Sequence, residues 1–332
     1  MTKVDIVVPC YNYGRFLEAS VSSILVQSVS DLRVLIIDDG SSDESLTVAR
    51  KLARDDSRVT VTSHSRNEGH INTFNEGIAW SSADYFLLLS ADDILVPGAL
   101  KRATEIMDEN PDVVLTHGKC ILWFDDLPLP IIEPQRRYSW ERHDLIGEMC
   151  TTGFNFVPAV TAIARTSVQK SVGDYRPSLP HTGDMEMWLR FAANGSVARI
   201  GEVQGIYRRH STAMSNAYYS EKLSDYRQCQ SAFDSFFDEY GGRVSGSVSL
   251  RRIARRALAK RVFCCGIGLL RRGRGKEAVH LMREAMKMDP SLRYFPPLWH
   301  LLKFPGPEGR KWFKSAVGGA ATRLWKQSGA MH

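Results

Sequence analysis

The sequence predicts an α/β fold with a mostly parallel, doubly wound sheet, followed by an α-helical C-terminal extension. Three observations support this prediction. Apolar runs typical of strands buried on both faces alternate with helical periodicity in the first third of the chain. Two of these runs end in paired Asp residues. Beyond about residue 250 the pattern becomes helical and strongly basic.

The N-terminal region alternates predicted strands with predicted helices. Strands are expected at Val4–Val8, Leu32–Ile37, Val59–Thr62 and Tyr85–Leu89. Helices are expected around Leu17–Leu25, up to about Leu52, and over Asn72–Trp80. This alternation favours parallel strands joined by crossover helices, so the carboxyl ends of the strands meet at one edge of the sheet.

The stretch YFLLLSADDILVPG, Tyr85–Gly98, organises the rest of the chain. It places Asp92 and Asp93 at the carboxyl end of a buried strand, where open α/β sheets bind ligands. Carboxylates are hard ligands, so the predicted occupant is Mg²⁺ or Mn²⁺ bridging to phosphate oxygens. Asp39 ends another strand, and we expect Asp39 and Asp92 to follow neighbouring strands.

After Ala99 the pattern is less regular. Strands are expected at Val113–Cys120 and Val157–Ala164, with a Pro-rich loop between them. An amphipathic helix begins near Asp184. An Asp at the start of a helix is usually an N-cap, and that interpretation stands beside a functional one.

Length and composition indicate about two domains, which we place at residues 1–220 and 221–332. The apolar run at the N-terminus is too short for a signal peptide, and Val262–Leu270 is too short to cross a membrane. Six Cys residues include no CxxC motif, which predicts reduced thiols in a cytoplasmic protein.

The net charge of +6 hides an asymmetry. Residues 251–332 contain 19 Lys and Arg against 4 Asp and Glu, so the remainder is acidic. Within this basic part, Leu250–Val262 has the spacing of an amphipathic helix, and Cys264–Pro290 resembles one tetratricopeptide helix pair. Lys311–Lys326 has the aromatic and basic composition of an interfacial helix.

Three interpretations of the basic extension compete. It could bind the anionic cytoplasmic face of a membrane, form the solvated face of a helical cap, or bind nucleic acid. We prefer the first and rank nucleic acid last, because no nucleic-acid recognition motif is present.

Six motifs occur in order along residues Val4–Met214: VPCYNYGRFLEASVSSIL, LIIDDGSSD, RNEGHINTFNEGI, YFLLLSADDILVPG, HTGDMEMWLR and GIYRRH. Together they resemble the family 2 glycosyltransferases, which have the Rossmann-like A-type nucleotide-sugar fold. The resemblance implies an inverting, metal-dependent enzyme that uses a nucleotide-diphosphate sugar, with UDP preferred. The implied acceptor is a saccharide or lipid-linked hydroxyl in surface polysaccharide or glycolipid biosynthesis.

The resemblance also implies roles for individual residues. Asp184 is implied as the general base for in-line attack, with Glu186 and Trp188 beside it as acceptor or sugar contacts. Asp92 and His210 are implied as the metal ligands. The implied donor-binding residues are Pro9, Tyr11, Asn12, Asp39, Asp92 and Asp93.

Two positions depart from the pattern of the family. Ser90 stands where many relatives have an Asp, and Gly183 stands where they often have a Glu. Two other classes of protein remain as alternatives. A nucleotidyltransferase of related fold would need a Gly-rich, basic first loop, and a sugar-nucleotide-binding protein would not need Asp92 and Asp184. Turnover of a nucleotide sugar with metal distinguishes all three.

Overall fold

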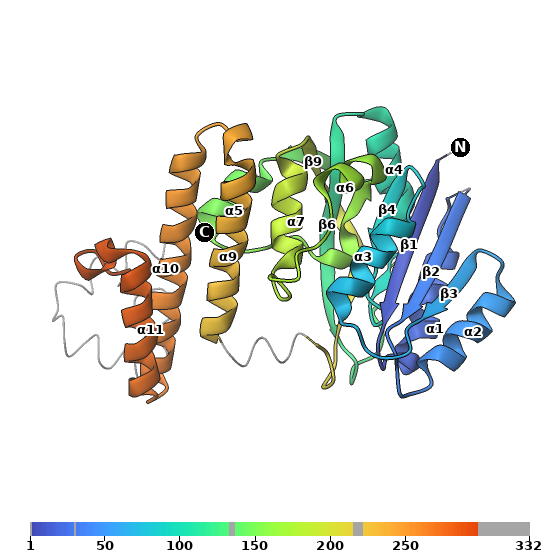
Figure 1. The fold of residues 1–332 in the computed structure, drawn as a ribbon, viewed down its shortest axis with the longest axis horizontal. Helices are drawn as coiled ribbons and strands as arrows, with labels where there is room; N and C mark the ends of the chain where they lie inside the picture. Colours follow the sequence, from blue (N-terminus) through green and yellow to red (C-terminus); the bar gives the residue numbers. More distant parts are fainter. Residues whose placement is uncertain (1, 30, 133–136, 215–221, 298–332) are drawn as a thin grey trace. The chain divides into compact units, whose positions relative to one another are not determined.

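The computed structural model describes residues 2–29, 31–132, 137–214 and 222–297 (Figure 1). The chain divides into two compact units, Met1–Arg251 and Arg252–His332. The first unit extends beyond the boundary that the sequence predicts after residue 220. The reason is that helix α9 (Lys222–Tyr240) packs on helix α7 (Gly183–Ala192) inside the first unit.

The described part of the first unit contains one mixed sheet of nine strands. Across the sheet they are β3 (Val59–Ser63), β2 (Asp31–Asp38), β1 (Lys3–Cys10), β4 (Tyr85–Leu88), β8 (Ile163–Arg165), β6 (Val113–Phe124), β9 (Ser196–Arg209) and β5 (Ile94–Leu95), and β7 (Trp140–His143) pairs with β9. The ladders of β1 with β2, β2 with β3, β1 with β4 and β6 with β9 are parallel, and the other four are antiparallel. The predicted fold class is therefore confirmed.

The strand order corrects one expectation. Strands β2 and β4, which precede Asp39 and Asp92, are not neighbours, because β1 lies between them and pairs with both. The chain runs from β1 outward to β2 and β3 and then returns to the other side of β1. This reversal of strand order is where doubly wound sheets bind ligands.

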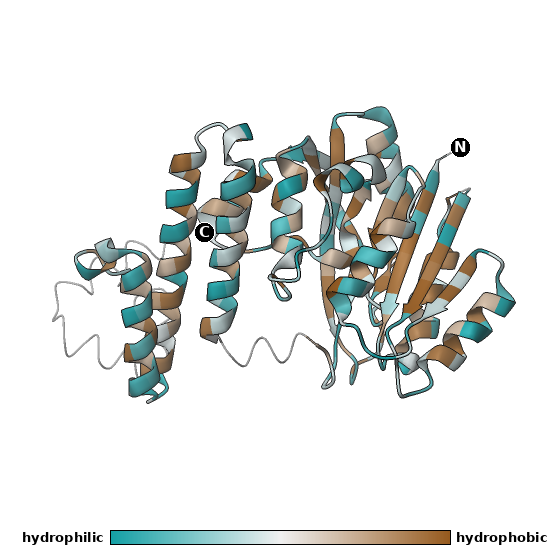
Figure 2. Ribbon diagram, in the orientation of Figure 1, coloured by the Kyte–Doolittle hydropathy of each residue, from teal (hydrophilic) through white to brown (hydrophobic). Residues whose placement is uncertain are grey.

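Helices cover both faces of the sheet. They are α1 (Gly14–Leu25), α2 (Ser45–Asp55), α3 (His70–Trp80), α4 (Ala99–Glu109), α6 (Thr166–Val172) and α7, while α5 (Leu145–Thr152) and α9 pack against α7. Even-numbered residues of β1, such as Ile6, share one core with α1, whereas Val7 faces α3. A Cβ on Gly77 of α3 would lie 2.4 Å from Cγ1 of Val7, so glycine permits this close packing. Figure 2 accordingly shows β1 and β2 as apolar over most of their length.

One strand is shorter than the sequence predicts. The region expected as a strand over Val157–Ala164 forms a 3-10 turn at Ala159–Thr161 and then the short strand β8. Pro158 precedes the turn and has no N–H to donate to a ladder. The pattern of apolar residues alone does not distinguish a buried turn from a buried strand.

The second unit is helical where it is described, as expected. Helix α10 (Ser247–Arg271), which begins in the first unit, is continuous where the sequence predicts two segments. After a turn at Gly273, helix α11 (Gly275–Met288) packs against it, and a Cβ on Gly266 would lie 2.9 Å from Cγ of Met282. A 3-10 turn, Pro290–Arg293, follows. The interfacial helix predicted at 311–326 lies outside the described residues.

None of the helices in the described ranges combines the length and apolar character of a membrane span.

Asp5 is fully buried in the apolar strand β1, and its carboxylate is completely hydrogen-bonded. Arg33 of β2 donates to both oxygens at 2.8 and 2.7 Å, and the backbone N–H groups of Ser82 and Ala83 donate to Oδ2 at 2.7 and 2.9 Å. This carboxylate therefore joins β1, β2 and the approach to β4. Its burial is tolerated because every interaction is made within the protein.

We predict that Asp5→Ala lowers the free energy of unfolding by about 3 kcal/mol, because it leaves two backbone N–H groups without an acceptor and removes the carboxylate that pairs with Arg33. Urea denaturation measures this change. The control is Asp31→Ala, which removes an exposed ion pair with Lys3 and should cost less than about 1 kcal/mol. Equal losses in the two variants would contradict the assignment.

Candidate active site

The loops that follow β1 and β2 are tied together at the carboxyl edge of the sheet. Asn12, the only non-glycine residue with positive φ in the described ranges, accepts from the N–H of Ser42 at 2.8 Å, and its own N–H donates to Ser41 Oγ at 2.9 Å. Of the predicted base-pocket residues on this loop, Tyr11 is 45% exposed and Pro9 is half-buried. An exposed aromatic ring on a hydrogen-bonded loop is available to stack on a ligand.

Asp39 connects the end of β2 to the start of α3. Its carboxylate accepts from the backbone N–H groups of Glu68 at 2.7 Å and Gly69 at 3.0 Å, and lies 2.8 Å from Nδ1 of His64. The other ring nitrogen of His64 lies 2.7 Å from Glu76. Burial lowers the pKa of His64, but the two carboxylates outweigh it and raise the pKa. Most of the hydrogen-bonding capacity of Asp39 is thus used inside the protein.

Asp38, which the sequence analysis did not select, has a carboxylate oxygen that can accept a further hydrogen bond. It is 2% exposed, and Oδ2 accepts a long hydrogen bond of 3.3 Å from the N–H of Ser41. Its Oδ1 atom is buried and has no hydrogen-bond partner among the described residues. Buried polar atoms are nearly always paired, so an unpaired one at a ligand-binding edge indicates a ligand contact. The two adjacent Asp residues in LIIDDGSSD were the sequence feature that could have identified Asp38 as a candidate site residue.

Asp92 and His210 converge, although they are far apart in sequence. Oδ2 of Asp92 lies 3.0 Å from Nε2 of His210, and Oδ1 accepts from Ser90 Oγ at 2.5 Å. Ser90, at the position where relatives often have an Asp, therefore orients Asp92. The rings of Tyr13 and Phe16 pack against His210 at 5.3 and 4.5 Å between centroids. The aromatic contacts hold the imidazole beside the carboxylate.

Arg208, near the end of β9, and His210, just after it, lie at this edge. The backbone N–H of Arg208 donates to Asp93 at 3.0 Å, and its Nε donates to the carbonyl oxygen of Asp92 at 2.9 Å. The guanidinium of Arg208 packs against the rings of Phe16 and Trp123. Its Cζ atom lies 4.6 and 4.3 Å from their centroids. Burial and the charge of Asp92 raise the pKa of Asp93 well above its usual range. Asp93 therefore acts in this structure as the anchor between β9 and the loop after β4.

The side chains of Asp92 and His210 fit a divalent cation that has few protein ligands. No group of three or more His, Cys, Asp or Glu side chains with metal-binding geometry occurs in the described ranges. A carboxylate oxygen and an imidazole nitrogen 3.0 Å apart can bind one ion, and Mg²⁺ in particular takes most of its remaining ligands from phosphate and water. The donor set thus fits a cation that is completed by a diphosphate.

Asp184 is the second residue of α7 and not its N-cap. The N-cap residue is Thr182, and it makes no capping hydrogen bond through its side chain. The phenol of Tyr175 and the imidazoles of His70 and His181 act electrostatically on Asp184. Burial raises the pKa of Asp184, and these three groups partly oppose the increase. A half-buried carboxylate with a raised pKa is suited to accept a proton.

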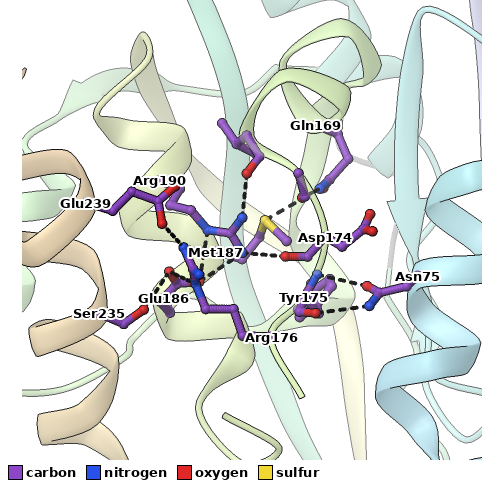
Figure 3. A network of polar contacts seen from close by, with 12 residues as sticks. Asn75, Gln169, Asp174, Tyr175, Arg176, Glu186, Met187, Arg190, Ser235 and Glu239 are labelled. Atoms are coloured by element: carbon purple, nitrogen blue, oxygen red, sulfur yellow. Dashed lines mark hydrogen bonds and ion pairs between the residues drawn. The ribbon is translucent and has the colours of Figure 1, made fainter. Parts of the chain in front are cut away.

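Glu186 lies on the opposite face of α7, in the network of Figure 3. It is fully buried, and its carboxylate pairs with Arg176 at 2.8 Å and with Arg190 at 2.9 Å. Ser235 of α9 donates to it at 3.4 Å, and Arg176 also pairs with Glu239 of α9. The acceptor contact predicted for Glu186 is corrected here, because no part of its carboxylate reaches solvent. It joins α7 to α9.

Trp188 is also part of the core. It is 4% exposed, and its ring packs at 6.3 Å from the ring of Phe191. A platform for a pyranose ring needs an exposed aromatic face. The sugar contact predicted for Trp188 is therefore corrected to a packing role.

Comparison with known proteins agrees with this geometry. Residues 5–155 match the model of the family described as glycosyl transferase family 2. An uncharacterized glycosyltransferase of Haemophilus influenzae is 26% identical over 224 residues, which cover 66% of this chain and 69% of the relative. The glycosyltransferase EpsJ of Bacillus subtilis is 33% identical over 107 residues, which cover 32% of this chain and 31% of the relative.

Two solved structures share the fold. S. aureus TarS residues 1–349 in complex with UDP-GlcNAc aligns with a TM-score of 0.58 and 15% identity, covering 88% of this chain and 92% of that one. Mannosyltransferase PcManGT from Pyrobaculum calidifontis, in complex with GDP-Man and Mn²⁺, aligns with a TM-score of 0.59 and 12% identity, covering 99% and 79%. Residues 5–155 are therefore a family 2 glycosyltransferase domain, and the chain shares the A-type fold of these two structures.

Proposed function

We propose that this glycosyltransferase is inverting and metal-dependent, and that it transfers a sugar from a nucleotide diphosphate to an acceptor hydroxyl. The observation that carries the proposal is the convergence of Asp92 and His210 at one edge of the sheet. The imidazole of His70, the first residue of α3, acts electrostatically on Asp184, and α3 starts at that same edge. A cation site for a leaving diphosphate and a base for an acceptor hydroxyl are the minimum that this reaction needs.

The donor nucleotide binds, in this proposal, across the loops after β1 and β2. Pro9, Tyr11 and Asn12 line the base pocket, and Asp38 accepts from a base N–H group. Asp39 orders the adjoining loop. UDP is the preferred nucleotide, because a UDP-sugar is present in the TarS complex, although the GDP-Man complex of PcManGT keeps GDP as the alternative.

The leaving diphosphate is held at the second part of the edge. Asp92 and His210 would hold Mg²⁺ or Mn²⁺, which when bound neutralises negative charge on the diphosphate. Ser90 and the rings of Tyr13 and Phe16 keep the two side chains in place. Asp93 acts through Arg208, which it positions, and not by direct contact with the ion.

The acceptor hydroxyl is activated by Asp184. Its carboxylate takes the hydroxyl proton while the acceptor oxygen attacks the anomeric carbon from the face opposite the diphosphate, so the configuration inverts. The raised pKa of Asp184 increases its basicity and keeps proton transfer favourable. The acceptor class that we propose is a saccharide or a lipid-linked sugar in surface polysaccharide or glycolipid synthesis.

We predict that one member of a panel of UDP, GDP and dTDP sugars releases nucleoside diphosphate with Mn²⁺, and that EDTA abolishes the release. Asp92→Ala should lower the rate at least about 100-fold. Asp184→Asn should lower acceptor-dependent release by about 10²–10⁴-fold and leave donor binding unchanged. Coupled detection of nucleoside diphosphate measures both. If no sugar nucleotide binds with metal, the proposal is wrong.

A second prediction concerns Asp38. Asp38→Asn replaces one carboxylate oxygen by an amide donor and should weaken UDP binding about tenfold, the effect of one lost hydrogen bond to a charged group. Isothermal titration calorimetry measures the affinity. Asp39→Asn is the matched control, and it should lower the melting temperature because its oxygens bind Glu68 and Gly69. Unchanged UDP affinity in Asp38→Asn would exclude the base contact.

We also propose that the second unit binds the anionic cytoplasmic face of a membrane, as the preferred interpretation of its charge. Exposed Arg252, Arg272 and Arg283 share the helix pair with exposed apolar residues such as Leu270 and Val279. Basic residues beside apolar ones are typical of interfacial helices. A cytoplasmic location agrees with the six free cysteines.

We predict that the full-length protein co-sediments with phosphatidylglycerol vesicles more strongly than with phosphatidylcholine vesicles. Replacing Arg252, Arg272 and Arg283 together by Gln should weaken the binding on the order of 100-fold, at about 1 kcal/mol for each charge. The control replaces three exposed basic residues of α2 by Gln. These are Arg50, Lys51 and Arg54. Equal effects of the two triple variants would contradict a specific membrane-binding unit.

A further inference from the structure

The segment after β9 is hydrogen-bonded to the start of α1. The backbone N–H of Met214 donates to the hydroxyl of Tyr13 at 3.2 Å. Nη2 of Arg15 donates to Oγ1 of Thr212 at 3.4 Å. The same Oγ1 atom lies 2.9 Å from Nδ1 of His210, the imidazole proposed to bind the cation. The side chain of Arg15 is therefore directed toward the candidate cation site.

The buried ring of Phe16 contacts three basic side chains. Cζ of Arg15 lies 4.3 Å from its centroid, Cζ of Arg208 lies 4.6 Å from it, and the ring of His210 packs at 4.5 Å between centroids. An aromatic ring attracts cations, so it holds two guanidinium groups close together although they repel each other. An anion bound beside them would relieve this repulsion.

The guanidinium of Arg15 can bind a ligand. The residue is exposed, and the bond to Thr212 is the one hydrogen bond that its guanidinium makes within the described residues. Arg15 also forms no ion pair in those ranges. By contrast, Arg33 and Arg176 of the same unit are paired with carboxylates at 2.7 and 2.8 Å. The positive charge of Arg15 is thus accessible and not neutralised by a carboxylate of the described chain.

A diphosphate at the cation site would match this guanidinium. Asp92 and His210 supply two protein ligands, so phosphate oxygens complete the coordination in the proposed complex. A guanidinium binds phosphate oxygens through two parallel hydrogen bonds. When the bond between the anomeric carbon and the diphosphate oxygen breaks, its electron pair stays on that oxygen, and the leaving group gains one negative charge. A positive group fixed beside the leaving group stabilises this charge.

We propose that Arg15 is a catalytic residue that binds the diphosphate of the donor beside the cation held by Asp92 and His210. This inference rests on the proposed function, because it requires a leaving diphosphate at that site. Thr212 and Phe16 position the guanidinium of Arg15. The bond between Arg15 and Thr212 thus gives the contact between the segment after β9 and α1 a role in donor binding.

The test compares the affinity of the full-length protein for a nucleoside diphosphate with its affinity for the nucleoside alone. Titration calorimetry with UDP, GDP and dTDP, each with Mn²⁺, identifies the nucleotide that the wild type binds, and a competition titration gives the affinity for its nucleoside. Arg15→Gln should weaken binding of the nucleoside diphosphate about 10–100-fold, the effect of lost hydrogen bonds between charged groups. The affinity for the nucleoside should not change.

Arg243→Gln is the matched control. Arg243 is also exposed, its Cζ atom lies 5.2 Å from the ring centroid of Tyr240, and it donates a hydrogen bond of 3.3 Å to Asn194. Its replacement should leave both affinities unchanged. Arg15→Lys keeps the positive charge but not the planar guanidinium, so it should recover part of the lost affinity. Melting temperatures show whether the three variants fold.

Two outcomes would overturn the inference. If folded Arg15→Gln binds the nucleoside diphosphate as tightly as the wild type does, Arg15 does not contact the diphosphate. If its affinity for the nucleoside falls by the same factor as its affinity for the nucleoside diphosphate, Arg15 shapes the base pocket instead.

The same titrations separate this inference from the proposed function. If the wild type binds none of the three nucleoside diphosphates with Mn²⁺, the proposed function fails. If it binds one in a manner that depends on Mn²⁺ and Asp92, but Arg15→Gln binds equally well, only the role of Arg15 is wrong. With the donor selected by the panel, Arg15→Gln should lower kcat/KM by at least the factor by which it weakens binding, because the negative charge is largest in the transition state.

Discussion

The hydrogen bonds that Asp39 accepts from the backbone of Glu68 and Gly69 are the constraint on which the candidate site depends. They fix the start of α3 at the carboxyl edge of the sheet. Asn75 of helix α3 then bonds the backbone of Tyr175, and the charge of His70 acts on Asp184. A carboxylate at the end of β2 thus fixes the start of α3, a helix of eleven residues that is hydrogen-bonded to the segment before α7.

Several carboxylates gather at this edge, and each is stabilised differently. Asp93 is anchored by the N–H of Arg208, Asp92 by Ser90 and His210, and Asp39 by two backbone N–H groups. Negative charges in a buried site repel each other and would repel a diphosphate. A bound cation relieves this repulsion, which supports a metal-dependent reaction. The arrangement favours a ligand that brings a cation with it.

The sequence was sufficient for the parallel core and for the edge at which Asp39 and Asp92 lie, because continuous apolar runs and alternating periodicity report burial directly. It was not sufficient where long-range packing decides. The position of Glu186 in the helix does not say whether its carboxylate faces solvent or other side chains. Only the fold shows that it pairs with Arg176 and Arg190. The pairing of Asp92 with His210 was accessible through the family resemblance alone.

Asp184 and Glu186 show how one short helix separates chemistry from stability. Residues two positions apart on an α-helix are rotated by about 200° about its axis, so the two carboxylates face opposite sides of the helix. Helix α7 buries Glu186 against two arginines and α9, which is tolerated because both oxygens are paired. That burial fixes the rotation of the helix about its axis. The same rotation places Asp184 on the side of α7 away from Glu186, so the buried ion pairs set the orientation of the proposed base.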